Sequence, residues 1–150
     1  MRNIVPLLVI IVICVGGGAL IGVFTGADAW YAALAKPSFN PPNWIFAPVW
    51  TSLYLLIAIA GWRTWRRERF GTAMTVWIVQ MVLNFLWSPI FFRAHSIGGA
   101  LIVIILMLVA IVAFMALVFR KDRVSFWLFA PYLAWVSFAT VLNASLLALN

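Results

Sequence analysis

Three apolar stretches of this sequence carry aromatic or amide side chains at helical spacing, and such side chains can bind a flat aromatic molecule. The three sets of residues are Phe46, Trp50 and Tyr54; Gln80, Asn84 and Ser88; and Tyr132, Trp135, Ala139 and Asn143. Side chains three or four residues apart share one face of an α-helix, and Trp87 lies one turn from Asn84. Because unpaired amides are costly in lipid, we expect these faces to turn inward and form a pocket walled by Trp and Tyr.

Conventional catalytic groups are not visible in the sequence. It has no nucleophile–base pair and no cluster of His, Cys and carboxylate residues spaced as in a metal site. We therefore predict no catalytic residue, no metal and no cofactor, with Trp50 and Trp135 as candidates for redox chemistry on a bound ligand. His95 is the only histidine, and we expect it to lie alone in a solvated loop. No charged residue lies well inside an apolar stretch, which argues against an ion-coupled carrier.

The aromatic and amide residues also have a simpler explanation. Trp and Tyr collect at membrane–water interfaces, and inward Asn and Gln can simply join helices, at roughly 0.6 kcal/mol per hydrogen bond. Trp50 and Trp135 fit the interfacial explanation least, because each shares a helical face with other aromatic or polar residues.

The elements that must position these side chains are membrane helices. The 150 residues are 67% hydrophobic and 9% charged, whereas soluble domains have about 25% charged residues. Five apolar stretches approach the roughly 20 residues that span a bilayer, at residues 4–24, 44–62, 72–92, 98–119 and 125–149. The alternating polarity of a membrane β-barrel is absent. We predict one all-α integral membrane domain over residues 1–150, built as a bundle of five transmembrane helices.

The three sets of residues named above form stripes along their helices, and the first and fourth spans have no such stripe. The first carries Gly18, Gly22 and Gly26, a small-residue repeat that allows close helix approach within the chain or between chains. It exceeds the 7–15 residues of a signal-peptide core, so we expect it to be retained, with Cys14 as a buried apolar residue. The fourth, residues 98–119, has no polar side chain, and we expect it to face lipid or another subunit.

The segment between the first two spans, residues 30–43, is rich in Pro and aromatic residues. Irregular backbone cannot face hydrocarbon, because its N–H and C=O groups would have no partner there. We therefore predict a lid that lies over the binding site.

The ten basic residues are distributed asymmetrically. Two are set apart, Lys36 in the lid and Arg93 after the third span; the other eight are Arg2, Arg63, Arg66, Arg67, Arg69, Arg120, Lys121 and Arg123. We place Arg63 to Arg69 in the connection between spans two and three. The positive-inside rule then predicts a cytoplasmic N-terminus, with the lid and the C-terminus on the exported side. These loops attract anionic headgroups, and no nucleic-acid partner is expected.

Three motifs resemble a known family. They are WYxxLxKPxFxPPxWxFxPVWTSLY at residues 30–54, NxLWSPxFF at 84–92 and PYLxWxxFAxxLN at 131–143. The chain resembles the translocator protein family, the TspO and peripheral benzodiazepine receptor group, over essentially its whole length. The resemblance implies a bacterial member, located in the inner (plasma) membrane and commonly a homodimer, that binds porphyrins and aromatic drug-like ligands beneath the first loop.

The resemblance also implies a set of ligand-binding residues. Combined with the stripe that contains Phe46 and with Trp30 at the start of the lid, the predicted set is Trp30, Tyr31, Phe46, Trp50, Tyr54, Asn84, Trp87, Trp135, Ala139, Leu142 and Asn143. Lys36 is the cation we expect nearest to a macrocycle's propionates. Mammalian members carry a sterol-recognition pattern near the C-terminus, whereas the sequence after Asn143 reads ASLLALN, so specific sterol binding has no basis here.

Three functions fit these features. The first is a membrane receptor or carrier for porphyrin-type tetrapyrroles, in their transport or regulation. The second is light-dependent porphyrin degradation that uses the pocket tryptophans and needs no acid–base pair. The third is a membrane scaffold or regulator in which ligand binding is incidental.

Overall fold

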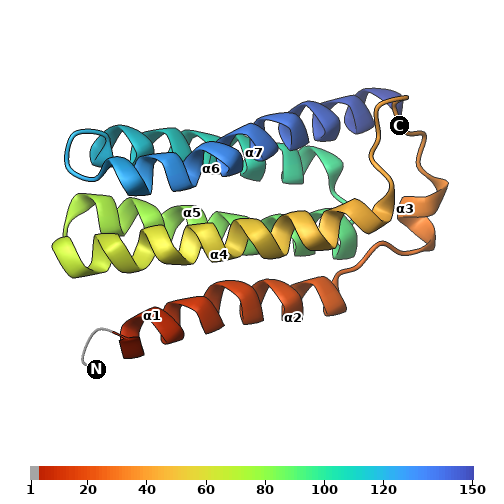
Figure 1. Cartoon of the computed structure of the whole chain (residues 1–150). Helices are drawn as coiled ribbons and strands as arrows, with labels where there is room; N and C mark the ends of the chain where they lie inside the picture. The colour runs from red at the N-terminus through yellow and green to blue at the C-terminus, as the bar shows by residue number, and fades with distance from the viewer. Residues whose placement is uncertain (1–3) are drawn as a thin grey trace.

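The computed structural model describes residues 4–150, and the five predicted spans are five long helices (Figure 1). The helical elements are α1 (Ile4–Ile11), η1 (Val12–Gly16) and α2 (Gly17–Phe24), which together form the first span; α3 (Ala29–Ala33); α4 (Asn43–Arg67); α5 (Thr72–Ser88), continued by η2 (Pro89–Arg93); α6 (Ile97–Val118); and α7 (Arg123–Leu149). No strand occurs among these described residues. The prediction of an all-α bundle of five membrane-spanning helices is confirmed.

The five long helices run side by side along one axis. In Figure 1 the first span lies along one side, α4 and α5 lie in the middle, and α6 and α7 lie on the other side. The α4–α5 and α6–α7 connections are at one end of the bundle, and the lid, with α3, is at the other end near the C-terminus. The fold therefore places the lid over the ends of the helices that carry the stripes.

Close packing between α4 and α5 depends on Gly61. A Cβ atom at this position would overlap the indole of Trp77 on α5. The indole is 5% exposed, and its Nε1 donates a hydrogen bond to the carbonyl of Ile57 at 3.1 Å. Because Gly61 has no side chain, this large ring can approach the neighbouring helix closely and still satisfy its polar atom.

The prediction that the fourth span faces lipid or another subunit holds for only one side of it, where Ile102, Leu106 and Val109 are more than half exposed. This span is α6, which packs against both α5 and α7. Ile111 and Phe114 are fully buried, and Phe114 lies 4.3 Å from Phe129 of α7 between ring centroids. A helix without polar side chains satisfies its backbone internally, so it can contact lipid or protein equally well. Its composition alone could not distinguish the two environments.

Two glycines of the first span, Gly17 and Gly18, pack closely against other helices of the chain. Gly18 lies against the ring of Tyr54 on α4, and Gly17 lies against Phe85 on α5. Gly22 has open space where a Cβ would stand. Cys14, on the same span, is fully buried, as predicted for a small apolar residue. The repeat therefore includes one position of close helix contact, Gly18, and one that has no close neighbour.

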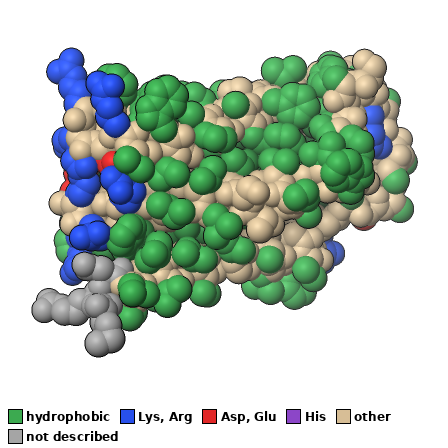
Figure 2. Space-filling view, in the orientation of Figure 1, with side chains coloured by type: hydrophobic (Ala, Val, Ile, Leu, Met, Phe, Trp, Pro, Cys, Tyr) green, Lys and Arg blue, Asp and Glu red, His purple; other side chains and the backbone are tan. Residues whose placement is uncertain are grey.

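Positively charged side chains are concentrated at one end of the bundle (Figure 2). Figure 2 shows Lys and Arg gathered at the end that carries the α4–α5 and α6–α7 connections. Three of the arginines predicted for the α4–α5 connection, Arg63, Arg66 and Arg67, instead belong to the last turns of α4, which extends to Arg67. Cations at a helix C-terminus interact favourably with its dipole. Arg2 lies outside the described residues.

Candidate ligand-binding site

Two charged residues terminate the short helix of the lid. The Oδ1 atom of Asp28 accepts a hydrogen bond from the backbone N–H of Tyr31 at 3.0 Å, which caps the start of α3. At the other end, Nζ of Lys36 donates to the carbonyls of Tyr31 at 2.7 Å and Leu34 at 3.2 Å. The hydrogen bond from the N–H of Tyr31 lowers the pKa of the Asp28 carboxyl, and the contact with His95 lowers it further to a smaller extent. In this structure Lys36 therefore caps the end of α3.

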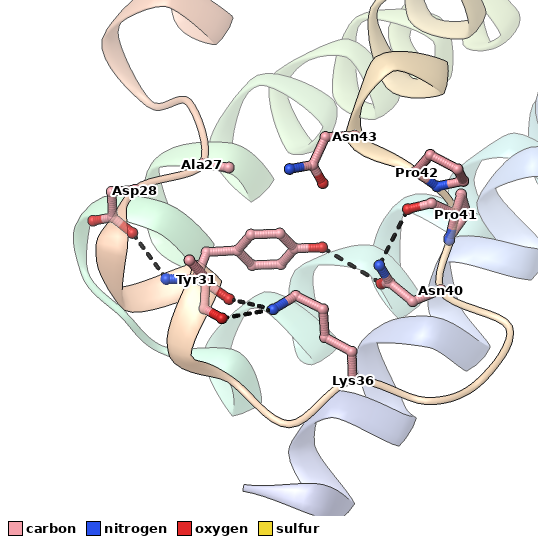
Figure 3. A pocket seen from close by; sticks show the side chains of 9 residues that line it. Ala27, Asp28, Tyr31, Lys36, Asn40, Pro41, Pro42 and Asn43 are labelled. Carbon is pink, nitrogen blue, oxygen red and sulfur yellow. Dashed lines mark hydrogen bonds between the residues drawn. The ribbon is translucent and has the colours of Figure 1, made fainter.

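The lid lines an open cavity of about 530 Å³ (Figure 3). Its lining residues are Ala27, Asp28, Tyr31, Ala32, Lys36, Asn40, Pro41, Pro42 and Asn43. The phenol of Tyr31 extends across the view toward Asn40, whose Oδ1 accepts its hydrogen bond at 3.4 Å. Nζ of Lys36 lies 4.7 Å from the centroid of the same ring. Burial raises the pKa of Tyr31, so this hydroxyl stays a neutral donor at physiological pH.

Aromatic contacts connect the lid to the helices below it. The Trp30 ring stacks on His95 with centroids 4.3 Å apart, and it meets the edge of Phe91 at 5.7 Å. Nε2 of His95 lies 3.2 Å from Oδ2 of Asp28. His95 is partly exposed, as predicted, but the expectation that it lies alone is wrong. Its partners precede it by more than sixty positions, so sequence proximity gave no indication of them.

A chain of hydrogen bonds crosses the bundle below the lid. The Tyr54 hydroxyl donates to Oδ1 of Asn84 at 2.7 Å, and Nδ2 of Asn84 donates to the Tyr132 hydroxyl at 2.8 Å. That hydroxyl in turn donates to Oε1 of Gln80 at 2.9 Å. Gln80 and Tyr132 are fully buried and Asn84 is 5% exposed, so the amides turn inward as predicted. Tyr132 and Gln80 belong to this hydrogen-bond chain, although the predicted site omitted them; their place in the stripes was the available signal.

The predicted aromatic residues contact one another next to this chain. The ring centroid of Trp50 lies 5.5 Å from that of Tyr54 and 6.3 Å from that of Tyr132. Phe46 meets the edge of Trp135 at 5.9 Å. These rings come from α4 and α7, and their tilted and edge-on geometries are the ones that aromatic pairs prefer.

Trp87 joins the two groups of buried side chains. Its Nε1 donates to Oδ1 of Asn143 at 3.1 Å, and its ring stacks on Phe91 at 5.2 Å. On one side it packs with Trp50, Tyr54, Trp135 and Ala139 against the main core. On the other it packs with the lid group, which contains Trp30, Tyr31, Phe46 and Leu142. The predicted set is therefore divided between two clusters that meet at Trp87, and Asn84 and Asn143 are hydrogen-bonded to Tyr54 and Trp87 of these clusters.

A second hollow, of about 620 Å³, lies between α4 and α7. Its lining residues are Pro41, Ile45, Val49, Ser52, Leu53, Leu56, Pro131, Ala134, Trp135 and Phe138. Tyr31 lines the lid cavity and Trp135 lines this groove, and neither hollow is lined by the other nine residues of the predicted set. Nε1 of Trp135 is buried and has no hydrogen-bond partner among the described residues, so an acceptor brought by a ligand could pair with it.

Fold and site together define an integral membrane protein with five spans and a Pro-rich lid over an interior of aromatic rings and amides. The model of the TspO/MBR family matches residues 10–149, and the chain belongs to this family. It is 38% identical over 135 residues to the tryptophan-rich sensory protein of Cereibacter sphaeroides, covering 90% of this chain and 85% of that one. Protein CrtK of Rhodobacter capsulatus is 37% identical, over 93% and 89%. The human translocator protein is 35% identical, over 76% and 70%.

Proposed function

We propose that this protein is a membrane receptor or carrier that binds porphyrin-type tetrapyrroles and other flat aromatic ligands beneath the lid. The observation that carries the proposal is the contact between the aromatic rings of α4, α5 and α7 and buried amides directly below a lid that holds a cavity of about 530 Å³. Pockets for drug-sized ligands measure about 300–1,000 Å³ and combine apolar walls with a few polar groups. Relatives named as sensory and translocator proteins support a role in sensing or transport.

A macrocycle would bind by inserting between the lid and the rings below it. It would gain buried apolar area and stacking, and the stacking contributes about 0.5–1.5 kcal/mol per ring beyond the area term. Nζ of Lys36 would move from the α3 carbonyls to a propionate, a stronger charge-assisted partner. Nε1 of Trp135 would pair with a polar group of the ligand. The lid must therefore shift when the ligand enters.

Truncation of one ring inside the predicted site, and of one ring outside it, tests the site. We expect Trp135→Ala to weaken porphyrin binding about threefold to tenfold, which corresponds to the loss of one stacking partner. Trp62→Ala is the control, because Trp62 lies near the basic end of α4, under Arg66. Fluorescence-quenching titrations of both purified variants measure the affinities. Equal losses in two well-folded variants would refute the site.

Ala139 offers a sharper test because its side chain is small. It packs against the main core on the α7 face that carries Trp135. We expect Ala139→Thr to narrow the ligand site and lower the affinity for a rigid macrocycle while the bundle stays folded. The alternative is that Ala139 serves only helix packing. In that case the melting temperature would fall and the affinity of the folded protein would remain unchanged.

Light-dependent porphyrin degradation is a second candidate function. The contacts of Trp50 with Tyr54 and Tyr132 favour it, because they place three oxidisable rings next to one another. Comparison of porphyrin breakdown in light and in darkness, for the native protein and for Trp50→Phe, tests it. Breakdown at the same rate in the variant would exclude Trp50 as a redox partner. A scaffold role would be supported if a folded variant that no longer binds porphyrin kept its cellular phenotype.

The asymmetry of charge supports an orientation in the inner (plasma) membrane. We place the N-terminus and the basic end in the cytoplasm, with the lid and the C-terminus on the exported side, in a homodimer. Reporter fusions after Asn150 that are active only in the cytoplasm would overturn this orientation. Cross-linking in native membranes tests the dimer.

A further inference from the structure

The basic end of the bundle has a large excess of unneutralised positive charge. Residues 63–69 and 120–123 contain seven Lys and Arg side chains and two carboxylates, Glu68 and Asp122. Asp122 is already occupied: Arg63 donates to it from Nε at 3.0 Å and from Nη2 at 2.8 Å, and Ser125 Oγ donates at 2.7 Å. Glu68 forms no ion pair within the described part of the chain. Nη1 of Arg67 lies 3.8 Å from the carboxylate of Asp122. The other five cations, Arg66, Arg69, Arg120, Lys121 and Arg123, form no ion pair within the described residues.

Aromatic rings hold three of these arginines in place. The guanidinium carbons of Arg66 and Arg69 lie 4.9 Å from the ring centroids of Trp62 and Trp65, respectively. The guanidinium carbon of Arg123 lies 5.0 Å from the ring centroid of Phe119. Each ring precedes its arginine by four positions. All three arginines are exposed. Stacking on a ring face orients a guanidinium but leaves its N–H groups available in the plane of the group. Such a group is prepared to donate to a phosphate oxygen.

Exposed apolar side chains flank these cations. Phe70, next to Arg69, is 91% exposed, and Trp127, one turn after Arg123, is 66% exposed. Figure 2 shows hydrophobic side chains directly beside the basic end. Aromatic residues at the end of a membrane span mark the level at which hydrocarbon meets headgroups. The arginines therefore stand at the depth of lipid phosphates.

We infer that the ring-stacked arginines at the end of α4, Arg66 and Arg69, bind the phosphate of an anionic phospholipid whose acyl chains lie along the bundle. This site lies at the end of the helices opposite the lid and differs from the porphyrin site. Positive charge selects the net negative headgroup, and the bidentate geometry of guanidinium suits its phosphodiester. Phe70 adds an apolar contact at the boundary between headgroup and chain.

Lipid titrations of the full-length protein in a neutral detergent test this inference. The probes are phosphatidylglycerol and phosphatidylcholine with identical acyl chains, read by native mass spectrometry and by the melting temperature. We expect phosphatidylglycerol to bind and stabilise the protein more than phosphatidylcholine does. In Arg66→Gln/Arg69→Gln we expect its affinity to fall about tenfold or more, as for the loss of a hydrogen bond to a charged group. The melting temperature without added lipid verifies that this variant is folded.

A second variant separates a defined site from diffuse attraction. Arg120→Gln/Lys121→Gln removes the same charge from the same end, at two exposed residues, and we expect less than about a threefold loss of affinity. Equal losses in the two double variants would overturn the site in favour of diffuse attraction. Inorganic phosphate at the same concentration should not stabilise the protein; stabilisation equal to that by phosphatidylglycerol would refute a lipid site. Equal binding of the two lipids by the native protein would also overturn the inference.

Discussion

The bridge between α4 and the α6–α7 connection makes Asp122 the residue whose charge we expect to matter most for stability. Its carboxylate is 6% exposed and accepts hydrogen bonds from Arg63 and Ser125. Burial alone would raise its pKa, but these bonds outweigh burial and lower the pKa from 3.8 to about 2. Since tenfold in an acid constant is worth about 1.4 kcal/mol, the ionised form gains on the order of 2 kcal/mol on folding.

The substitution Asp122→Asn removes this charge and retains the helix cap. An Asn side chain can still accept the hydrogen bond from the N–H of Ser125 at the start of α7. We expect the free energy of unfolding to fall by about 2 kcal/mol at pH 7, and by about 1 kcal/mol more in Asp122→Ala, which also lacks the cap. Denaturant unfolding in detergent micelles, followed by circular dichroism, measures both changes.

The pH dependence of the stability tests whether the charge of Asp122 is the cause of this stabilisation. Because folding lowers the pKa of Asp122, its stabilisation is fully present above about pH 4 and is lost as the pH falls through about 2. The difference in stability between the native protein and Asp122→Asn should therefore close over this range. A difference that is undiminished at pH 2, or is absent at pH 7, would refute the reasoning. A double-mutant cycle with Arg63→Gln then isolates the energy of the ion pair itself.

Two further predictions concern packing and hydrogen bonding. Gly18→Ala should lower the stability by about 1–3 kcal/mol, because the new methyl would overlap Tyr54, whereas Gly22→Ala on the same helix should have little effect in the open space there; similar melting temperatures for the two variants would contradict this. Asn143→Leu should cost about 1–3 kcal/mol because the indole N–H of Trp87 loses its acceptor, and a melting curve that matches the native one would show that another group replaces it.

Several features of this protein follow from its sequence because the bilayer imposes them locally. Hydrocarbon thickness sets the length of a span, so apolar runs predicted five helices whose bounds in the structure differ by a few residues. The cost of an unpaired amide in lipid turned Gln80, Asn84 and Asn143 inward. The three motifs and their spacing along the chain identified the family. Each of these inferences needs only residue types and their spacing along the chain.

Only the tertiary structure decided which faces meet. Helical periodicity assigns a residue to a face but does not say which helix that face contacts, so the burial of α6 between α5 and α7 could not be predicted. Arg63 and Asp122 are 59 positions apart, and no local pattern links them. The same holds for His95 with Trp30, and for the placement of Tyr31 and Trp135 in separate hollows. These contacts arise when the helices pack, because an interaction across the bundle depends on the position of every helix at once.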